Sequence, residues 1–254
     1  MRVLFAPAKR MRIDNDAISH QTLPVFLEEA ERLRDWLRRL SREELRKLWQ
    51  CNHAILDQNI ERLSSMNLRS DLTPAILAYD GIAYQYMAPG VFEDGAFAWV
   101  QEHLRILSGF YGVLRPMDGI VPYRLEMRAR VTLQGKNLYD FWGRKLYREI
   151  SDGSGVFLNL ASKEYAQCIA AWHTPEDRFI TCVFGEQRQG KIVQKGVHVK
   201  MARGQMVRLM AERGVQEPEE IRHFDVLGYC YDAMRSDKQT YVFVKNGEEC
   251  RNAL

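Results

Sequence analysis

Two cations follow a predicted strand close to the start of this 254-residue chain. Lys9 and Arg10 come directly after a buried strand expected at residues 3–8, and Pro7 stiffens the loop that presents them. Ligands of proteins with mixed helices and strands often bind where such loops leave a sheet edge. The alternative interpretation is an ordinary basic loop near a terminus.

A second pair of cations opens a predicted helix late in the chain. Lys200 and Arg203 lie three residues apart at the start of a helix expected at 201–213, so they share one helix face. Cations at the amino end oppose the helix dipole, and that local cost predicts an anionic partner. An acidic side chain from elsewhere in the fold would serve as well as a ligand.

A glycine-containing turn at residues 108–112 resembles a helix-hairpin-helix, a module that binds nucleic-acid backbones. Helical periodicity from residue 94 runs to about Ser108, and two glycines separated by two aromatic residues follow. Glycines in a tight connection expose backbone N–H groups that can hold a phosphate. The alternative is a capped helix followed by a structural turn. The candidate phosphate-binding residues here are Arg105, Ser108, Gly109, Tyr111, Gly112 and Arg115.

Two further segments place polar side chains where elements end. Arg124 and Glu126 share one face of an extended segment, so they form either an ion pair or an anion site oriented by the carboxylate. Asn159 ends a predicted strand at 156–160, and Ser162 begins the helix that follows. A polar side chain beside a helix amino end is a frequent ligand geometry, although a simple helix cap has the same pattern.

The net charge of +3 hides an uneven distribution along the chain. Residues 1–13 carry four bases and no acid, residues 103–148 carry nine bases and three acids, and residues 188–213 carry seven bases and one acid. Residues 70–102, by contrast, contain five acids and no base. If the three basic segments converge, they form a positive surface that attracts phosphates. The alternative is three separate solvated faces.

The elements that must position these residues are mixed without regular strand–helix alternation. This pattern predicts an α+β fold: a single compact mixed α/β domain over residues 1–254, with the helix-hairpin-helix-like segment at about 94–118. Helices are expected at 26–40, 42–63, 94–108, 137–150 and 201–213, and strands at 3–8, 75–79, 156–160, 179–184, 191–194 and 241–244.

Composition and spacing exclude several classes of protein. Hydrophobic residues make up 46% of the chain, which is typical of a globular protein, and no uncharged apolar stretch approaches the length of a membrane span. Charged residues follow the amino-terminal apolar stretch too early for the apolar core of a signal peptide, so we expect a cytoplasmic protein with no membrane partner. The scattered Cys and His residues show no metal-ligand spacing, so no metal and no cofactor is predicted.

These segments, in their order and separations, resemble the YaaA family of bacterial peroxide-stress proteins over nearly the whole chain. The matching motifs are Pro7-Ala8-Lys9, the stretch 105–116, Pro122 to Met127, Tyr139 to Gly143, Asn159 to Tyr165 and Lys200 to Gly204. Two positions depart from the family pattern. Ala6 replaces a frequent serine, and Asp80 precedes Gly81 where many members have a basic or neutral residue, so the loop at Asp80 is left out of the predicted site.

The resemblance implies a compact mixed α/β fold with a positively charged cleft and a helix-hairpin-helix element that bind DNA. It also implies protection of DNA during hydrogen peroxide stress, with lowered free iron. It implies no catalytic residue, DNA form or oligomeric state.

Three functional hypotheses follow. In the first, a DNA-binding stress protein contacts mainly phosphates, because the sequence shows no base-reading cluster. The residues predicted to bind DNA are Lys9, Arg10, Arg105, Ser108, Gly109, Tyr111, Gly112, Arg115, Arg124, Lys200 and Arg203, with Glu126, Asn159 and Ser162 as polar groups of the cleft. In the second, an enzyme acts on a nucleotide-like or other anionic small molecule in the same cleft. Direct iron handling is the weakest of the three.

Overall fold

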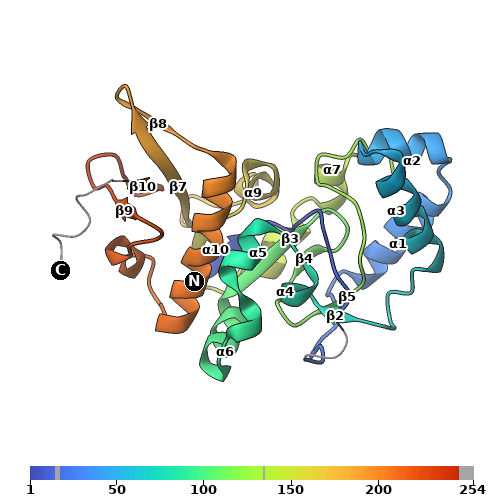
Figure 1. The fold of residues 1–254 in the computed structure, drawn as a ribbon, viewed down its shortest axis with the longest axis horizontal. Helices are drawn as coiled ribbons and strands as arrows, with labels where there is room; N and C mark the ends of the chain where they lie inside the picture. The colour runs from blue at the N-terminus through green and yellow to red at the C-terminus, as the bar shows by residue number, and fades with distance from the viewer. Residues whose placement is uncertain (15–17, 134, 246–254) are drawn as a thin grey trace.

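A mixed sheet of eight strands forms the centre of the molecule (Figure 1). The computed structural model describes residues 1–14, 18–133 and 135–245. Seven strands follow the order β4-β3-β1-β6-β7-β10-β9, and β8 pairs with β7. The five central strands are parallel: β3 (Leu104–Ser108), β1 (Arg2–Phe5), β6 (Val156–Asn159), β7 (Arg178–Arg188) and β10 (Thr240–Lys245). The antiparallel strands are β4 (Gly112–Leu114), β9 (Tyr229–Tyr231) and β8 (Lys191–Val193).

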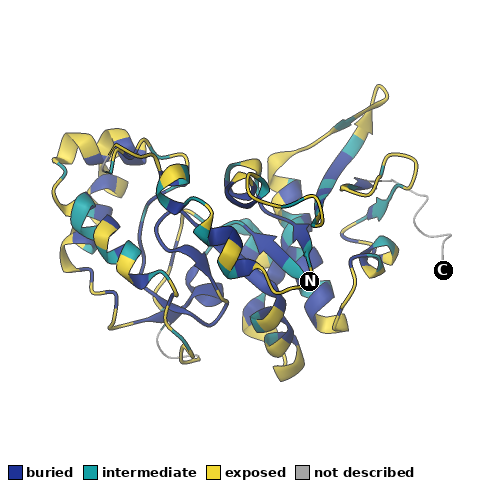
Figure 2. Cartoon of the chain, turned by 180° about the vertical axis from the view of Figure 1, so that it is seen from behind, coloured by how far each residue is buried: buried dark blue, intermediate teal, exposed yellow. Residues whose placement is uncertain are grey.

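Burial on both faces explains why the central strands are continuous apolar runs. Val3, Leu4 and Phe5 of β1 are at most 1% exposed, and every residue of β3 is buried. Helices cover both faces of a parallel sheet, so its strands lack the alternation of a half-exposed strand. Figure 2 shows the resulting distribution, with buried residues concentrated in the sheet and exposed residues on the outer helices.

The described residues form ten α-helices, which lie against the sheet or beside it. The first three form a lobe at one end of the molecule (Figure 1): α1 (Leu27–Arg38), α2 (Arg42–Trp49) and α3 (His53–Ser65). The others are α4 (Ala75–Ala78), α5 (Ile82–Met87), α6 (Asp94–His103), α7 (Leu138–Trp142), α8 (Lys145–Ile150), α9 (Lys163–Ala170) and α10 (Gly196–Arg213). Two short 3₁₀ helices, η1 (Pro89–Val91) and η2 (Glu220–His223), and a small ladder of β2 (Thr73–Pro74) with β5 (Gly119–Ile120) complete the described elements.

The long helix α10 packs unusually closely against α5. A Cβ atom added to Gly204 would lie 1.9 Å from the carbonyl oxygen of Ala83, so only glycine allows this approach. The contact fixes α10, and with it Lys200 and Arg203, beside α5.

The predicted single compact mixed α/β domain is confirmed, and several of its details change. The predicted helix 94–108 ends at His103, and the chain continues as strand β3 because its apolar residues pair with β1. The segment 94–118 is therefore a helix followed by a β-hairpin, and the prediction of a helix-hairpin-helix element is wrong.

Three other sequence predictions differ from the structure. The strand expected at 75–79 is the short buried helix α4, because a buried apolar run of this length fits either element. The helix expected at 137–150 is divided at Gly143, which has a φ of +50°. The central strands are parallel, which places the sheet closer to the α/β class than the irregular order of elements indicated.

Candidate functional site

A pocket of about 560 Å³ opens at the carboxyl ends of β1 and β6. The chain passes from β1 to β3 on one side of β1 and later returns to β6 on the other side. Loops that diverge in this way leave a crevice between them, and ligands of open parallel sheets bind in such crevices. Five cations and three carboxylates line the pocket: Lys9, Arg10, Arg124, Lys200 and Arg203, with Asp80, Glu126 and Glu164.

One side of the pocket is a cluster organised by a single carboxylate. Glu126 lies 3.0 Å from Lys9 Nζ and 3.5 Å from Arg124 Nη2. Arg124 is held further by a hydrogen bond of 3.2 Å from Nη2 to the carbonyl oxygen of Trp49, and its side chain is only 11% exposed. The three side chains are thus linked through one carboxylate, and their formal charges sum to +1.

A second part of the pocket lining comes from α10 and carries two cations without carboxylate partners among the described residues. Lys200 and Arg203 form no ion pair with any residue that the structure describes. The Nε atom of Arg203 is buried and has no hydrogen-bond partner within the same residues, and burial lowers the pKa of this guanidinium. An unpaired buried cation is costly, so this side of the pocket favours an anionic ligand.

The amino end of α9 adds neutral donors to the same pocket. Ser162 is the N-cap residue of α9 and lines the pocket, and its hydroxyl group makes no capping hydrogen bond. Free N–H groups in the first turn of a helix attract anions, and here they lie beside the cations of α10. The pocket therefore combines charged and neutral donors of the kind that bind phosphate or carboxylate groups.

The loop at Asp80 lines this pocket, although the acidic side chain had argued against a place for it in the predicted site. Asp80 accepts a 2.7 Å hydrogen bond from Arg10 Nε, and Arg10 lines the pocket with it. A Cβ atom on Gly81 would lie 2.8 Å from Ala8 Cβ, so the glycine lets this loop pack against the one after β1. The Asp-Gly turn was visible in the sequence, but nothing in it indicated which loop it contacts. Tyr84, Gln85 and Tyr165, which also line the pocket, were missed for the same reason.

The turn between β3 and β4 does not line the pocket but contacts it through Tyr123, which does. Ser108 Oγ accepts hydrogen bonds from the N–H groups of Phe110 and Tyr111, so its own proton is donated to Tyr123 Oη at 2.6 Å. Tyr123 in turn contacts Tyr79 Oη at 2.8 Å, and burial raises the pKa of Tyr123 to about 12. The N–H groups predicted to hold a phosphate are thus satisfied inside the protein.

The two glycines of this turn are required by packing. A Cβ atom on Gly109 would lie 2.5 Å from the carbonyl oxygen of Leu125, and one on Gly112, whose φ is +74°, would collide with Trp142. Tyr111 is fully buried and accepts a hydrogen bond from the N–H of Val121. Ser108, Gly109, Tyr111 and Gly112 therefore lie in the core, and the prediction that they contact DNA is wrong because they are not exposed.

Arg105 and Arg115 lie away from the pocket, toward the amino ends of β1 and β3. Arg105 donates hydrogen bonds to the carbonyl oxygens of Leu104 and Gln101 and is 7% exposed. Burial, with repulsion from Arg2 and Arg115, lowers the pKa of Arg105 to about 10. Both arginines line two other cavities, so the prediction that they share one groove with Lys9 is wrong.

Asn159 also lies outside the pocket lining. Its side chain accepts a hydrogen bond from the N–H of Ala161 and contacts Thr181 Oγ1 at 3.3 Å, which orders the turn between β6 and α9. Of the fourteen residues predicted for the site, seven line the pocket: Lys9, Arg10, Arg124, Glu126, Ser162, Lys200 and Arg203.

No helix in residues 1–14, 18–133 or 135–245 is long and apolar enough to cross a bilayer. Over the same ranges, no three His, Cys, Asp or Glu side chains gather into a group able to hold a metal ion.

The fold and the pocket together define a mixed α/β protein with a pocket lined by cations at the carboxyl edge of its sheet. Comparison with known proteins gives its family. The model of the family described as "Peroxide stress protein YaaA" matches residues 1–235, and this chain belongs to that family.

Relatives of this chain share nearly its whole length. A UPF0246 protein of Agathobacter rectalis is 50% identical over 244 residues, which cover 96% of this chain and 98% of the relative. A UPF0246 protein of Desulfitobacterium hafniense is also 50% identical, over 246 residues and the same shares. One of Lachnoclostridium phytofermentans is 46% identical over 99% of both chains.

Proposed function

We propose that this protein binds DNA during peroxide stress and holds backbone phosphates at the rim of the pocket. The observation that carries the proposal is the pair Lys200 and Arg203, which line the same pocket as the Lys9–Glu126–Arg124 cluster and have no carboxylate partner among the described residues. Cations from segments far apart in the sequence thus line one pocket, and a polyanion would neutralise the excess charge. Such a role places the protein in the cytoplasm with the DNA.

The size of the pocket limits how DNA would be held. A volume of about 560 Å³ is that of a small-ligand site, so a duplex lies across the opening and does not enter it. Contacts are then made to phosphates by cations at the rim and by the donors at the start of α9. Phosphate contacts carry little sequence information, so we expect little sequence preference.

Neutralising one cation at the rim tests this proposal. We expect Lys200→Gln to weaken binding to a duplex oligonucleotide and to lower the slope of log affinity against log salt by about 0.9, the contribution of one phosphate contact. Arg115→Gln is the matched control, because Arg115 is a half-exposed cation outside the pocket. Equal effects of the two substitutions, or a wild-type affinity that does not depend on salt, would refute the proposal.

The second candidate function is an enzyme that acts on a nucleotide-like or other small anion. It is favoured by the Lys9–Glu126–Arg124 cluster, since a carboxylate held between two cations is typical of a preorganised site. Calorimetric titration with mononucleotides separates the candidates. Saturable binding that Glu126→Gln abolishes, in a protein that shows no affinity for duplex DNA, would favour the enzyme and exclude the first proposal.

A further inference from the structure

The outer part of β7 leaves the sheet as a two-stranded ribbon. Residues 178–185 of β7 pair with β6 and β10, whereas residues 186–188 pair only with β8. The ribbon consequently projects beyond the body of the molecule (Figure 1). Its base is fixed at Gly185, where a Cβ atom would lie 2.3 Å from a methyl carbon of Ile192.

The turn at the tip of this ribbon has a defined geometry. Gln189 and Gly190 have φ angles of +48° and +79°, the signs of a two-residue type I′ turn. This turn matches the twist of the flanking strands, so the ribbon is a regular hairpin. We call residues 186–193 the arm. The hairpin predicted around Gly190 is confirmed.

The arm carries an uncompensated positive charge at its tip. Arg188 and Lys191 are directly opposite in the ladder, and like charges in that position repel each other. Lys191 forms no ion pair within the described part of the chain, and Arg188 lies 3.4 Å from a Glu186 that also binds Lys195 at 2.8 Å. Glu186 is the only acid among residues 185–200, which contain four Lys and Arg residues.

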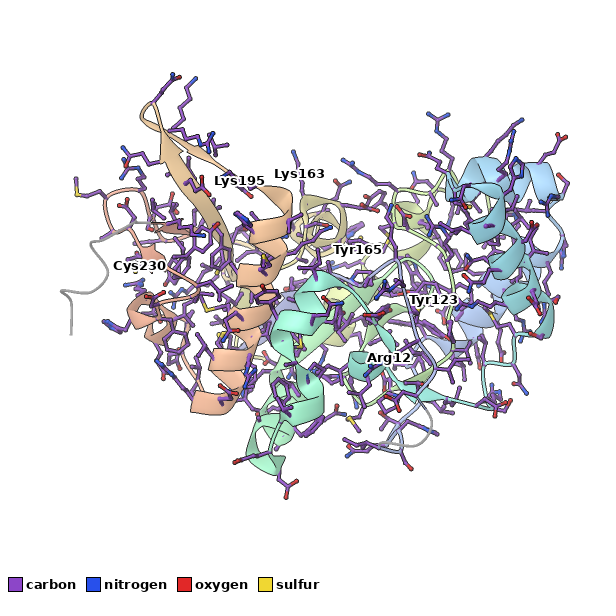
Figure 3. All side chains as sticks on the ribbon, in the orientation of Figure 1. Arg12, Tyr123, Lys163, Tyr165, Lys195 and Cys230 are labelled. Atoms are coloured by element: carbon purple, nitrogen blue, oxygen red, sulfur yellow. The ribbon has the colours of Figure 1, made fainter. Side chains whose placement is uncertain are left out.

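Helix α10 connects the arm to the pocket. Lys195, two residues after the arm, is the N-cap residue of this helix, and Lys200 of the same helix lines the pocket. Figure 3 shows Lys195 higher in the view than the labelled Tyr165 of the pocket. A polyanion that contacts the pocket rim would therefore meet the arm as well.

We propose that the arm binds duplex DNA by entering its major groove, with Arg188 and Lys191 on the flanking phosphates. This inference rests on the proposed DNA-binding function. A major groove about 12 Å wide admits a two-stranded β-ribbon. The tip is polar, with Gln189 and Gly190 between the two cations, so it has no apolar side chains to insert into a membrane.

A double substitution at the tip tests the arm. We expect Arg188→Gln with Lys191→Gln to lower the salt slope of duplex binding by about 1.8, as for two lost phosphate contacts. The control is Arg46→Gln with Lys47→Gln, which removes two exposed charges from α2 at the other end of the molecule (Figure 1). Both pairs are exposed, so neither double variant should change the melting temperature.

The outcomes separate the arm from the pocket. If Lys200→Gln weakens duplex binding but the tip variant behaves like its control, the arm inference is overturned and the pocket proposal stands. If the tip substitutions reduce binding to vesicles of acidic phospholipid and leave duplex binding unchanged, the arm is a membrane contact and the inference is overturned. If the wild-type protein does not bind duplex DNA, both proposals fall.

Discussion

The close contact between α10 and α5 predicts a strong effect of Gly204→Ala. The added Cβ would lie 1.9 Å from the carbonyl oxygen and 2.8 Å from the carbonyl carbon of Ala83. These are backbone atoms that cannot rotate away, so α10 must move from α5 by about 1 Å or more in a close-packed interior. The movement displaces Lys200 and Arg203 relative to the other residues that line the pocket.

The expected loss of stability is the difference of two opposing effects. Overpacking costs about 3 kcal/mol at the upper end of the usual range. Alanine in a helix interior regains about 1 kcal/mol relative to glycine. The net destabilisation is then about 2 kcal/mol, which for a protein of this size lowers the melting temperature by about 4–8 °C.

Thermal unfolding and DNA binding measured on the same samples test this reasoning. Gly196→Ala is the control, because Gly196 begins the same helix and a Cβ there would meet no atom within 4 Å. We expect the control to be as stable as the wild type or slightly more stable. A Gly204→Ala protein with unchanged melting temperature and unchanged duplex affinity would show that the close approach is not required, and the reasoning would be refuted.

Two other substitutions test the core and the acid sensitivity of the fold. Ser108→Ala removes the acceptor of two buried N–H groups and the donor to Tyr123. We expect chemical denaturation to show a free energy of unfolding lower by about 1–3 kcal/mol, with duplex affinity retained. A loss of duplex affinity in a stable variant would instead indicate that Ser108 contacts DNA directly. Burial raises the pKa of Asp177, but hydrogen bonds from Tyr147 Oη at 2.6 Å and from the N–H of Thr174 at 2.7 Å lower it more, so the folded-state pKa lies below the usual 3.8. The ionised Asp177 therefore stabilises the fold above pH 3.8, and this contribution is lost as the pH falls through the folded-state pKa. We expect Asp177→Asn to flatten the decline of melting temperature between about pH 5 and pH 2. An unchanged decline would contradict a lowered pKa of Asp177 in the folded state.

The sequence by itself located many of the local elements and several of the cations that line the pocket. Strand β1 is recognised by its apolar run, and the turn of the arm by Gly190 between two polar stretches. Lys9 and Lys200 were predicted from their positions beside these elements, and both line the pocket. These features depend on neighbours a few residues apart, so periodicity and turn chemistry are sufficient to find them.

Only the tertiary structure decided which segments meet. The pairing of Val3 with Leu104 converts the end of a predicted helix into β3, buries Arg105 at the amino side of the sheet and places Ser108 under the pocket. The same long-range packing brings the Asp80 loop to Arg10, although its acidic charge had argued against a role there. Strand order and helix packing are set by contacts between residues that are distant in the sequence, and no local pattern encodes the free energy of those contacts. The fold, and not the motifs, therefore decided which residues line the pocket.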